Sequence, residues 1–343
     1  FIFFFFICSQ LKNKKILVTT GLKRNQGLDD LHLGSNQELG KEGAEWLADW
    51  LGENPRLTHL RLKDIGLGDS GAQALAAALY SNQHLETLGL NDNQIQDAGL
   101  QAVAAALAAN PNGCLRTLGL GYNRIGARGL QALAEALPGF GALTKLHLEG
   151  NTVGSDGARA LARALATNTC HLTALDLTGN GIGADGVQCL LESLPRSRLE
   201  VLYLSNNSMS LGGAQVLASA LQLPDCRLRD LVLTTCGLGD AEAGALAVGL
   251  QTNTSLSMLT LSLNNIQDHG AEALGSMLRH NSTLTQLTLK NNPVGNLGAL
   301  ALARALQHNV WLQRLGLSGD AIDPGVLEAI KCKCALNQKV NGQ

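Results

Sequence analysis

One glycine-rich segment has the spacing of a dinucleotide-binding loop. Residues 181–186 read G-I-G-A-D-G, which matches G-x-G-x-x-G, between a strand-like and a helix-like segment. In nucleotide-binding proteins, such glycines let the backbone approach a pyrophosphate at a helix N-terminus. Equivalent places elsewhere in the chain also carry glycines, as in R-I-G-A-R-G at 124–129. We therefore interpret these glycines as part of a recurring turn, not as a cofactor site.

Cysteine and histidine spacings suggest metal ligands at two places. Cys332 and Cys334 form C-x-C, but no second cysteine pair or nearby histidine completes a four-ligand zinc site. His32 and His59 are expected on adjacent strands, without a convincing third ligand. The patterns H-E-x-x-H, G-x-S-x-G and G-x-x-x-x-G-K-[ST] do not occur. The sequence therefore predicts no cofactor, no metal and no enzymatic activity.

The elements that position these residues come from an internal repeat. Eleven copies of L-x-x-L-x-L-x-x-N-x-I/V/L begin 27 to 30 residues apart, from Leu28 to Leu312, within a chain of 343 residues. Two well-kept copies occupy 115–137 and 284–306. Leucines two apart face one side of a short strand. The Asn follows where the chain turns inward, and stacked copies are expected to form an Asn ladder, because a primary amide satisfies buried turn N–H and C=O groups.

The second half of each copy is expected to be a helix. Glycine pairs such as Gly126 and Gly129 permit a tight turn, and A-x-A-L-A-x-A-L places apolar residues on one face. One strand and helix cannot bury an inner face alone, so the copies must stack. Parallel strands lie about 4.8 Å apart and helices about 8–10 Å apart. We therefore expect an α/β horseshoe solenoid of about eleven repeats, with a parallel sheet on the concave face and helices on the convex face.

Many of these helices end in Asn, the residue that most often replaces Gly in a left-handed cap. We expect such caps at Asn54, Asn110, Asn168, Asn253, Asn281 and Asn309.

Departures from the pattern indicate the ends of the domain. We expect an N-terminal cap over 16–27, a repeat domain over 28–334 and a C-terminal tail over 335–343. Bulky residues in the first copy and a capped helix in the last are typical of terminal repeats; they are Trp46, Trp50, Asp323 and Pro324. The ladder Asn is replaced by Ile65, Cys236 and Asp320, and a turn glycine by Glu242, so that last turn should differ.

Residues 1–15 differ in kind from the rest. The apolar run F-I-F-F-F-F-I-C is followed by S-Q-L-K-N-K-K. A signal peptide carries its positive charge before the apolar run, and eight residues are too few for the roughly 20 that span a bilayer. Three interpretations stay open: the end of a truncated transmembrane helix, a short peripheral anchor, or a spurious extension. Membrane association is not expected unless residues 1–8 are the end of a truncated transmembrane segment.

Composition excludes several function classes. With 26 basic and 28 acidic residues mixed along the chain, no electrostatic footprint for nucleic acid is visible. A hydrophobic content of 45% can bury a core, so global disorder is excluded. Eight dispersed cysteines are too few for a disulfide scaffold and favour a reducing, cytoplasmic setting. We expect a monomer by default.

At 28–334 the repeats resemble the ribonuclease-inhibitor type of leucine-rich repeat, and the G-A-x-A-L-A-x-A-L-x-x-N helices are most similar to the repeat regions of NOD-like receptors. The resemblance implies a non-catalytic module for protein partners, used in sensing, binding or autoinhibition. Ran GTPase-activating proteins share this repeat type, so a GTPase activator is the alternative, although their acidic tail is not matched by C-K-C-A-L-N-Q-K-V-N-G-Q at 332–343. Ribonuclease inhibitors are strongly acidic and cysteine-rich, which a net charge of −2 and eight cysteines do not match.

The register also identifies the side chains that face the concave side. Most of their charge, and two tyrosines, fall in the first seven copies, whereas copies eight to ten are rich in Thr and Ser. Threonine on an open strand also reflects β-propensity alone. Tyrosine and arginine are enriched in binding hot spots. We predict that a protein partner, of unknown identity, contacts Arg61, Tyr122, His147, Asp176 and Tyr203, the alternative being that these are ordinary solvated strand residues.

Overall fold

The computed structural model describes residues 27–54, 56–319 and 321–341. The segment 1–15 and nearly all of the expected cap over 16–27 lie outside these residues. None of the helices in the described ranges is both long and apolar enough to cross a membrane. The chain divides into two compact units, residues 1–176 and 177–343, which are considered separately.

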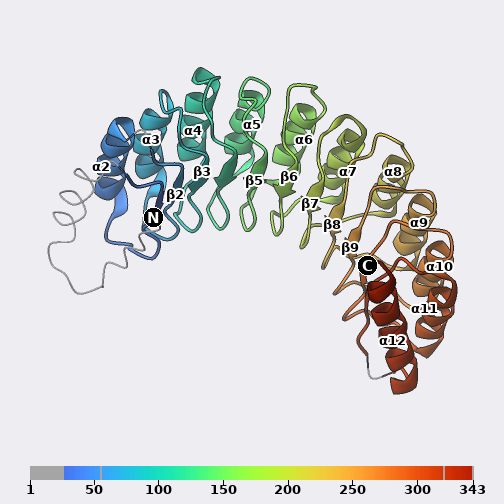
Figure 1. Ribbon diagram of the computed structural model, residues 1–343. Helices are drawn as coiled ribbons and strands as arrows, with labels where there is room; N and C mark the ends of the chain where they lie inside the picture. The colour runs from blue at the N-terminus through green and yellow to red at the C-terminus, as the bar shows by residue number, and fades with distance from the viewer. Residues whose placement is uncertain (1–26, 55, 320, 342–343) are drawn as a thin grey trace. The chain divides into compact units, whose positions relative to one another are not determined.

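Unit 1 alternates short strands with helices (Figure 1). Its strands are β1 (Asp30–His32), β2 (His59–Arg61), β3 (Thr87–Gly89), β4 (Thr117–Gly119), β5 (Lys145–His147) and β6 (Ala174–Asp176). Its helices are α2 (Gly40–Glu53), α3 (Gly68–Leu79), α4 (Asp97–Ala109), α5 (Ala127–Ala136) and α6 (Gly154–Leu165).

Unit 2 continues the same alternation. Its strands are β7 (Val201–Tyr203), β8 (Asp230–Val232), β9 (Met258–Thr260), β10 (Gln286–Thr288) and β11 (Arg314–Gly316). Its helices are α7 (Ala184–Ser193) with a 3₁₀ turn η1 (Leu194–Arg196), α8 (Leu211–Leu221), α9 (Asp240–Leu250), α10 (Asp268–Leu278), α11 (Asn296–His308) and α12 (Pro324–Asn341).

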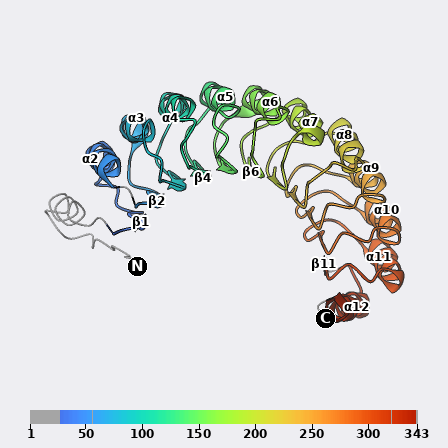
Figure 2. The same cartoon turned by 45° about the horizontal axis from the view of Figure 1, so that its top comes forward.

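Within each unit the strands pair in parallel and in sequence order, one per repeat. In each unit the strands form one layer and the helices the other, with the sheet on the concave side (Figure 2). The middle residue of every strand is a leucine in equivalent register, as in Leu60, Leu88 and Leu118. These three leucines are at most 1% exposed, and each contributes about 1.5–3 kcal/mol by burial. The predicted α/β solenoid of eleven strand–helix repeats with a parallel sheet is confirmed.

The predicted Asn ladder is also confirmed, and Asn123 illustrates its chemistry. Its Oδ1 accepts the backbone N–H groups of Asn93 and Ile95 in the preceding repeat, each at 3.0 Å. Its Nδ2 donates to the carbonyl oxygens of Leu90 and Leu120, at 3.0 and 2.8 Å. One side chain thus closes its own turn and joins it to the previous turn.

The Asn residues at the helix ends do not adopt the left-handed conformation, so that prediction is wrong. The φ angles of Asn54, Asn110 and Asn309 are −100°, −120° and −86°. These residues instead form a second ladder. Asn309 Nδ2 donates to Leu278 O at 2.7 Å, and its Oδ1 accepts the N–H of Leu312 at 2.8 Å. The amide holds two neighbouring helix ends together, a role that glycine cannot fill.

The glycines before the helices serve close packing. Neither Gly126 nor Gly129 has a positive φ. A Cβ on Gly129 would lie 2.7 Å from Oδ1 of Asp97, at the start of the preceding helix. That oxygen accepts the N–H groups of Gly126 and Gly129, at 2.7 and 2.9 Å. Each such carboxylate therefore caps the next repeat's helix, where the helix dipole favours negative charge.

Glu242 supplies this cap where the first turn of the preceding helix has no acidic residue. The preceding helix begins with Leu211, and Glu242 Oε2 accepts the N–H of Gly239 at 2.8 Å. The prediction that this turn differs is confirmed.

Two of the substituted ladder positions have local compensation. Ile65 is fully buried, and the carbonyl oxygen of Leu33, which a ladder Asn at position 65 would contact, accepts an N–H from Asn36 Nδ2 at 2.8 Å. Cys236 keeps the donor role through Sγ, 3.4 Å from Leu204 O. Asp320 lies outside the described residues.

Both ends carry the expected departures. Trp46 and Trp50 stack with ring centroids 6.3 Å apart. Asp323 caps α12 through Oδ1, which accepts the N–H of Gly325 at 2.6 Å. The helix then continues to Asn341, so the predicted boundary after residue 334 falls within it. The buried Asn337 donates to Asn309 O and Leu312 O and thereby extends the second ladder.

Candidate functional site

The sheet face of unit 1 carries side chains at the ends of its strands. The last residue of each strand is, in order, His32, Arg61, Gly89, Gly119, His147 and Asp176. These positions are in register across β1–β6, so their side chains form one row. The two glycines leave the middle of the row open between charged groups at either end.

Arg61 is part of a charged cluster at the β1 end. Its guanidinium contacts both carboxylate oxygens of Asp30 at 2.7 Å and also the ring of His32. The register aligns His32 with Arg61, and His59 with Asp30. His59 is bonded through Nδ1 to Thr58 Oγ1 at 2.8 Å. His32 and His59 therefore lie on adjacent strands, as expected, but in different rows of the sheet.

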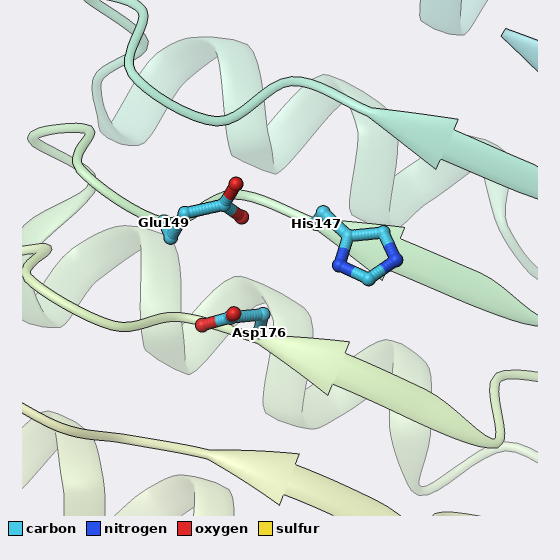
Figure 3. Close-up of side chains that lie close together, drawn as sticks. All are labelled: His147, Glu149 and Asp176. Carbon is cyan, nitrogen blue, oxygen red and sulfur yellow. The ribbon is translucent and has the colours of Figure 1, made fainter. Parts of the chain in front are cut away.

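His147 and Asp176 lie next to each other at the other end of the row, together with Glu149 (Figure 3). One ligand atom from each side chain lies within 4.8 Å of the other two. Oε1 of Glu149 accepts an N–H from Asn91 Nδ2 at 3.1 Å. This bond crosses the turn after β4, where Gly121 has no side chain; a Cβ there would overlap the Glu149 carboxylate.

The Glu149 carboxylate is partly withdrawn from water. Burial raises the pKa of this carboxyl above its ordinary value, and the nearby Asp176 carboxylate adds to the rise. A backbone hydrogen bond, the His147 ring and Asn91 act in the opposite direction. Oε2 is buried and has no hydrogen-bond partner among the described residues. The site thus holds a carboxylate oxygen whose hydrogen-bonding capacity is unused.

Tyr122 belongs to a groove beside this row, where the chain leaves the strands. The groove measures about 600 Å³ and is lined by Ser35, Lys63, Asp64, Asp92, Gln94, Tyr122, Asn123 and Arg124. Its lining is mostly polar, with an ion pair of 3.2 Å between Lys63 Nζ and Asp92 Oδ2. Tyr122 is 60% exposed and is the large apolar surface of the groove. A Cβ on Gly150 would meet its ring at 2.7 Å, so the ring lies against the next turn.

The backbone at Tyr122 is left-handed, with φ 55°. The residue before the ladder position has a positive φ throughout the described repeats, and Gly150 and Gly179 occupy it in the two following repeats. A non-glycine residue there costs roughly 1–2 kcal/mol. The chain therefore holds an exposed aromatic ring at a position that favours glycine.

Tyr203 is the last residue of β7 in unit 2, where it is half-buried. It aligns with Val232 of β8. The structure thus brings together His147 and Asp176, engages Arg61 in an ion pair, and exposes Tyr122 in the groove.

The sequence analysis missed the groove and the unused carboxylate oxygen, Oε2, of Glu149. The groove was detectable, because its members follow the strands at fixed offsets in successive repeats. The unused Glu149 oxygen was not detectable from the sequence, because it depends on the space above Gly121. Cys332 is exposed and Cys334 buried, so the C-x-C pair faces two environments.

Comparisons with known proteins agree with the fold. The family model for the leucine-rich repeat matches residues 53–76, 81–104, 112–134, 143–162, 168–191, 252–275 and 280–303. No curated protein matches the chain. These matches and the parallel strand–helix architecture are those of a leucine-rich repeat solenoid.

Two solved structures illustrate the similarity. Actin-binding site 2 of leiomodin-1 aligns with 17% identity and a TM-score of 0.40, over 55% of this chain and 91% of that chain. The tropomodulin C-terminal domain of Caenorhabditis elegans aligns with 14% identity and a TM-score of 0.38, over 55% of this chain and 95% of that chain.

Proposed function

We propose that this protein is a non-catalytic interaction module and that a protein partner binds the sheet face and groove of unit 1. The observation that carries the proposal is Tyr122, an aromatic side chain 60% exposed on a left-handed residue beside a polar groove. Exposed tyrosines surrounded by polar groups are common in the centre of protein interfaces. Leucine-rich repeats in general serve as scaffolds for such contacts.

The charges around the groove favour a partner of mixed polarity. Lys63, Asp92 and Arg124 place both signs within one surface. A partner that presents complementary charges around a central apolar group gains specificity from the rim and affinity from the contact with Tyr122.

More specifically, we propose that the module acts in the cytoplasm as a monomer and serves as a sensing or regulatory repeat region of the NOD-like receptor kind. The repeat pattern supports this role, and none of the seven cysteines in the described part of the chain forms a disulfide. The GTPase-activator alternative predicts accelerated phosphate release from Ran-type GTPases. Equal rates with and without the protein would exclude it.

The test of the interaction surface uses two tyrosines. Tyr122→Ala removes the groove ring, and Tyr80→Ala is the control, because Tyr80 is 49% exposed at the end of α3. We expect Tyr122→Ala to weaken binding of a captured partner about 30-fold, the equivalent of about 2 kcal/mol for an interface hot spot, while Tyr80→Ala binds normally. Equal binding by both variants, with unchanged circular dichroism spectra, would place the interface elsewhere.

A further inference from the structure

Three metal-ligating side chains of different chemistry meet on the sheet face of unit 1. His147 ends β5 and Asp176 ends β6, and the parallel register places them side by side. Glu149 lies two residues beyond His147, so it projects to the same side. One ligand atom from each of the three lies within 4.8 Å of the others. Figure 3 shows the imidazole and the two carboxylates around one point.

The Glu149 carboxylate has one unused oxygen. Oε2 is buried without a hydrogen-bond partner among the described residues, whereas Oε1 is bonded to Asn91. An unsatisfied buried acceptor destabilises the fold, and more strongly so when it is charged. A second carboxylate nearby, that of Asp176, adds negative charge to the same volume. A bound cation would satisfy the oxygen and offset both charges.

The neighbouring strands orient the Glu149 carboxylate. Asn91 reaches it from the turn after β3, across the repeat of β4. This reach depends on missing side chains: a Cβ on Gly119 would lie 2.6 Å from Asn91 Oδ1, and one on Gly121 would lie 2.8 Å from Asn91 Nδ2. Such an outer hydrogen bond is how proteins hold a ligating carboxylate in place.

We propose that His147, Glu149 and Asp176 bind one divalent transition-metal ion of the Zn²⁺ class. The donor set of one imidazole and two carboxylates suits Zn²⁺, whereas Mg²⁺ and Ca²⁺ prefer oxygen alone. Ligand atoms around a tetrahedral zinc lie about 3.4 Å apart, given bonds of about 2.0–2.2 Å. Small side-chain rotations therefore close the site. Three protein ligands leave one coordination position open on the sheet face.

The first experiment measures Zn²⁺ and Mg²⁺ binding to the full chain by titration calorimetry. Glu149→Gln keeps the size of the side chain and removes its charge, and Glu135→Gln is the control on the exposed face of α5. We expect one Zn²⁺ per chain, Mg²⁺ binding at least about 100-fold weaker, and a loss of Zn²⁺ affinity of at least about 10-fold in Glu149→Gln. Glu135→Gln is expected to bind like the parent.

Cobalt substitution distinguishes metal binding at this site from metal binding by the cysteines. Co²⁺ in the proposed site gives visible d–d absorption without a thiolate charge-transfer band, and His147→Gln abolishes the signal. Gly121→Ala, which displaces Glu149, is expected to weaken binding as well, with an unchanged circular dichroism spectrum. The proposal is overturned by a thiolate band, by Zn²⁺ affinity equal in Glu149→Gln and Glu135→Gln, or by no measurable Zn²⁺ binding.

Discussion

The Asn ladder makes a quantitative prediction at Asn123. Its side chain is 7% exposed and joins the third and fourth repeats. Replacement by Ala leaves the N–H groups of Asn93 and Ile95 without the acceptor that now lies 3.0 Å from each. A buried donor without a partner costs about 1–3 kcal/mol. Counting these two donors alone, we expect Asn123→Ala to lower the free energy of unfolding by about 2–6 kcal/mol.

Two further variants test whether the stability loss comes from the ladder hydrogen bonds or from the removal of any amide side chain. Asn123→Cys retains a weak donor, as Cys236 does in the eighth repeat, so we expect a smaller loss than with Ala. Asn265→Ala makes the same chemical change at an exposed residue that follows a ladder Asn. Its expected effect is within about 0.5 kcal/mol of zero.

The assay combines urea unfolding, followed by circular dichroism, with amide hydrogen exchange. Because repeat proteins open locally, exchange locates the loss. We expect the amide protons of Asn93 and Ile95 to lose protection in Asn123→Ala, while those of unit 2 keep theirs. A stability loss below about 1 kcal/mol, with both amides still protected, would refute the proposed role of the ladder.

Three other predictions concern the helix caps, a buried thiol and the last helix. Asp97→Ala should cost about 1–2 kcal/mol and speed amide exchange at the start of α5, whose first N–H groups it binds; unchanged exchange there would contradict the cap. Burial raises the pKa of Cys236 from 9.0 to about 11. The neutral thiol therefore stabilises the fold below about pH 9, and this contribution is lost as the pH rises towards 11; the part of the fall in the free energy of unfolding between about pH 9 and 11 that comes from this thiol should be absent in Cys236→Ala. At pH 8, iodoacetamide should label the exposed Cys114 well before Cys236, which peptide mass spectrometry would check. Asn337→Ala should release α12 by removing its bonds to the carbonyl oxygens of Asn309 and Leu312, seen as faster exchange in α12 and normal exchange in α8.

Much of the fold could be predicted because every repeat carries nearly the same pattern of leucines, Asn and small residues. Leucines two apart give a strand with one buried face, and the Asn after it satisfies a buried turn. What the sequence did not reveal was the direction of the contacts between repeats. Asp97 caps the next helix, and Asn309 bonds the previous helix end. Such partners lie about one repeat away. The pattern within a single repeat instead predicted tight turns at the glycines and left-handed caps at the Asn residues.

The candidate site was predictable in position but not in chemistry. The register placed His147, Asp176 and Tyr122 on the accessible side of the repeats, as the structure has them. The reach of Asn91 to Glu149, 58 residues away, depends on the absence of a side chain at Gly121. No short motif encodes that arrangement, which explains why the sequence predicted no metal site.

The central claim is that a protein partner binds the sheet face and groove of unit 1, and site-specific photo-crosslinking tests it most directly. A photoreactive phenylalanine derivative replaces Tyr122 in one preparation and Tyr80 in another, both of them exposed tyrosines. We expect irradiation to join the partner to position 122, with no cross-link from position 80 on the helical side. Cross-links from position 80 and none from position 122 would contradict the proposed surface.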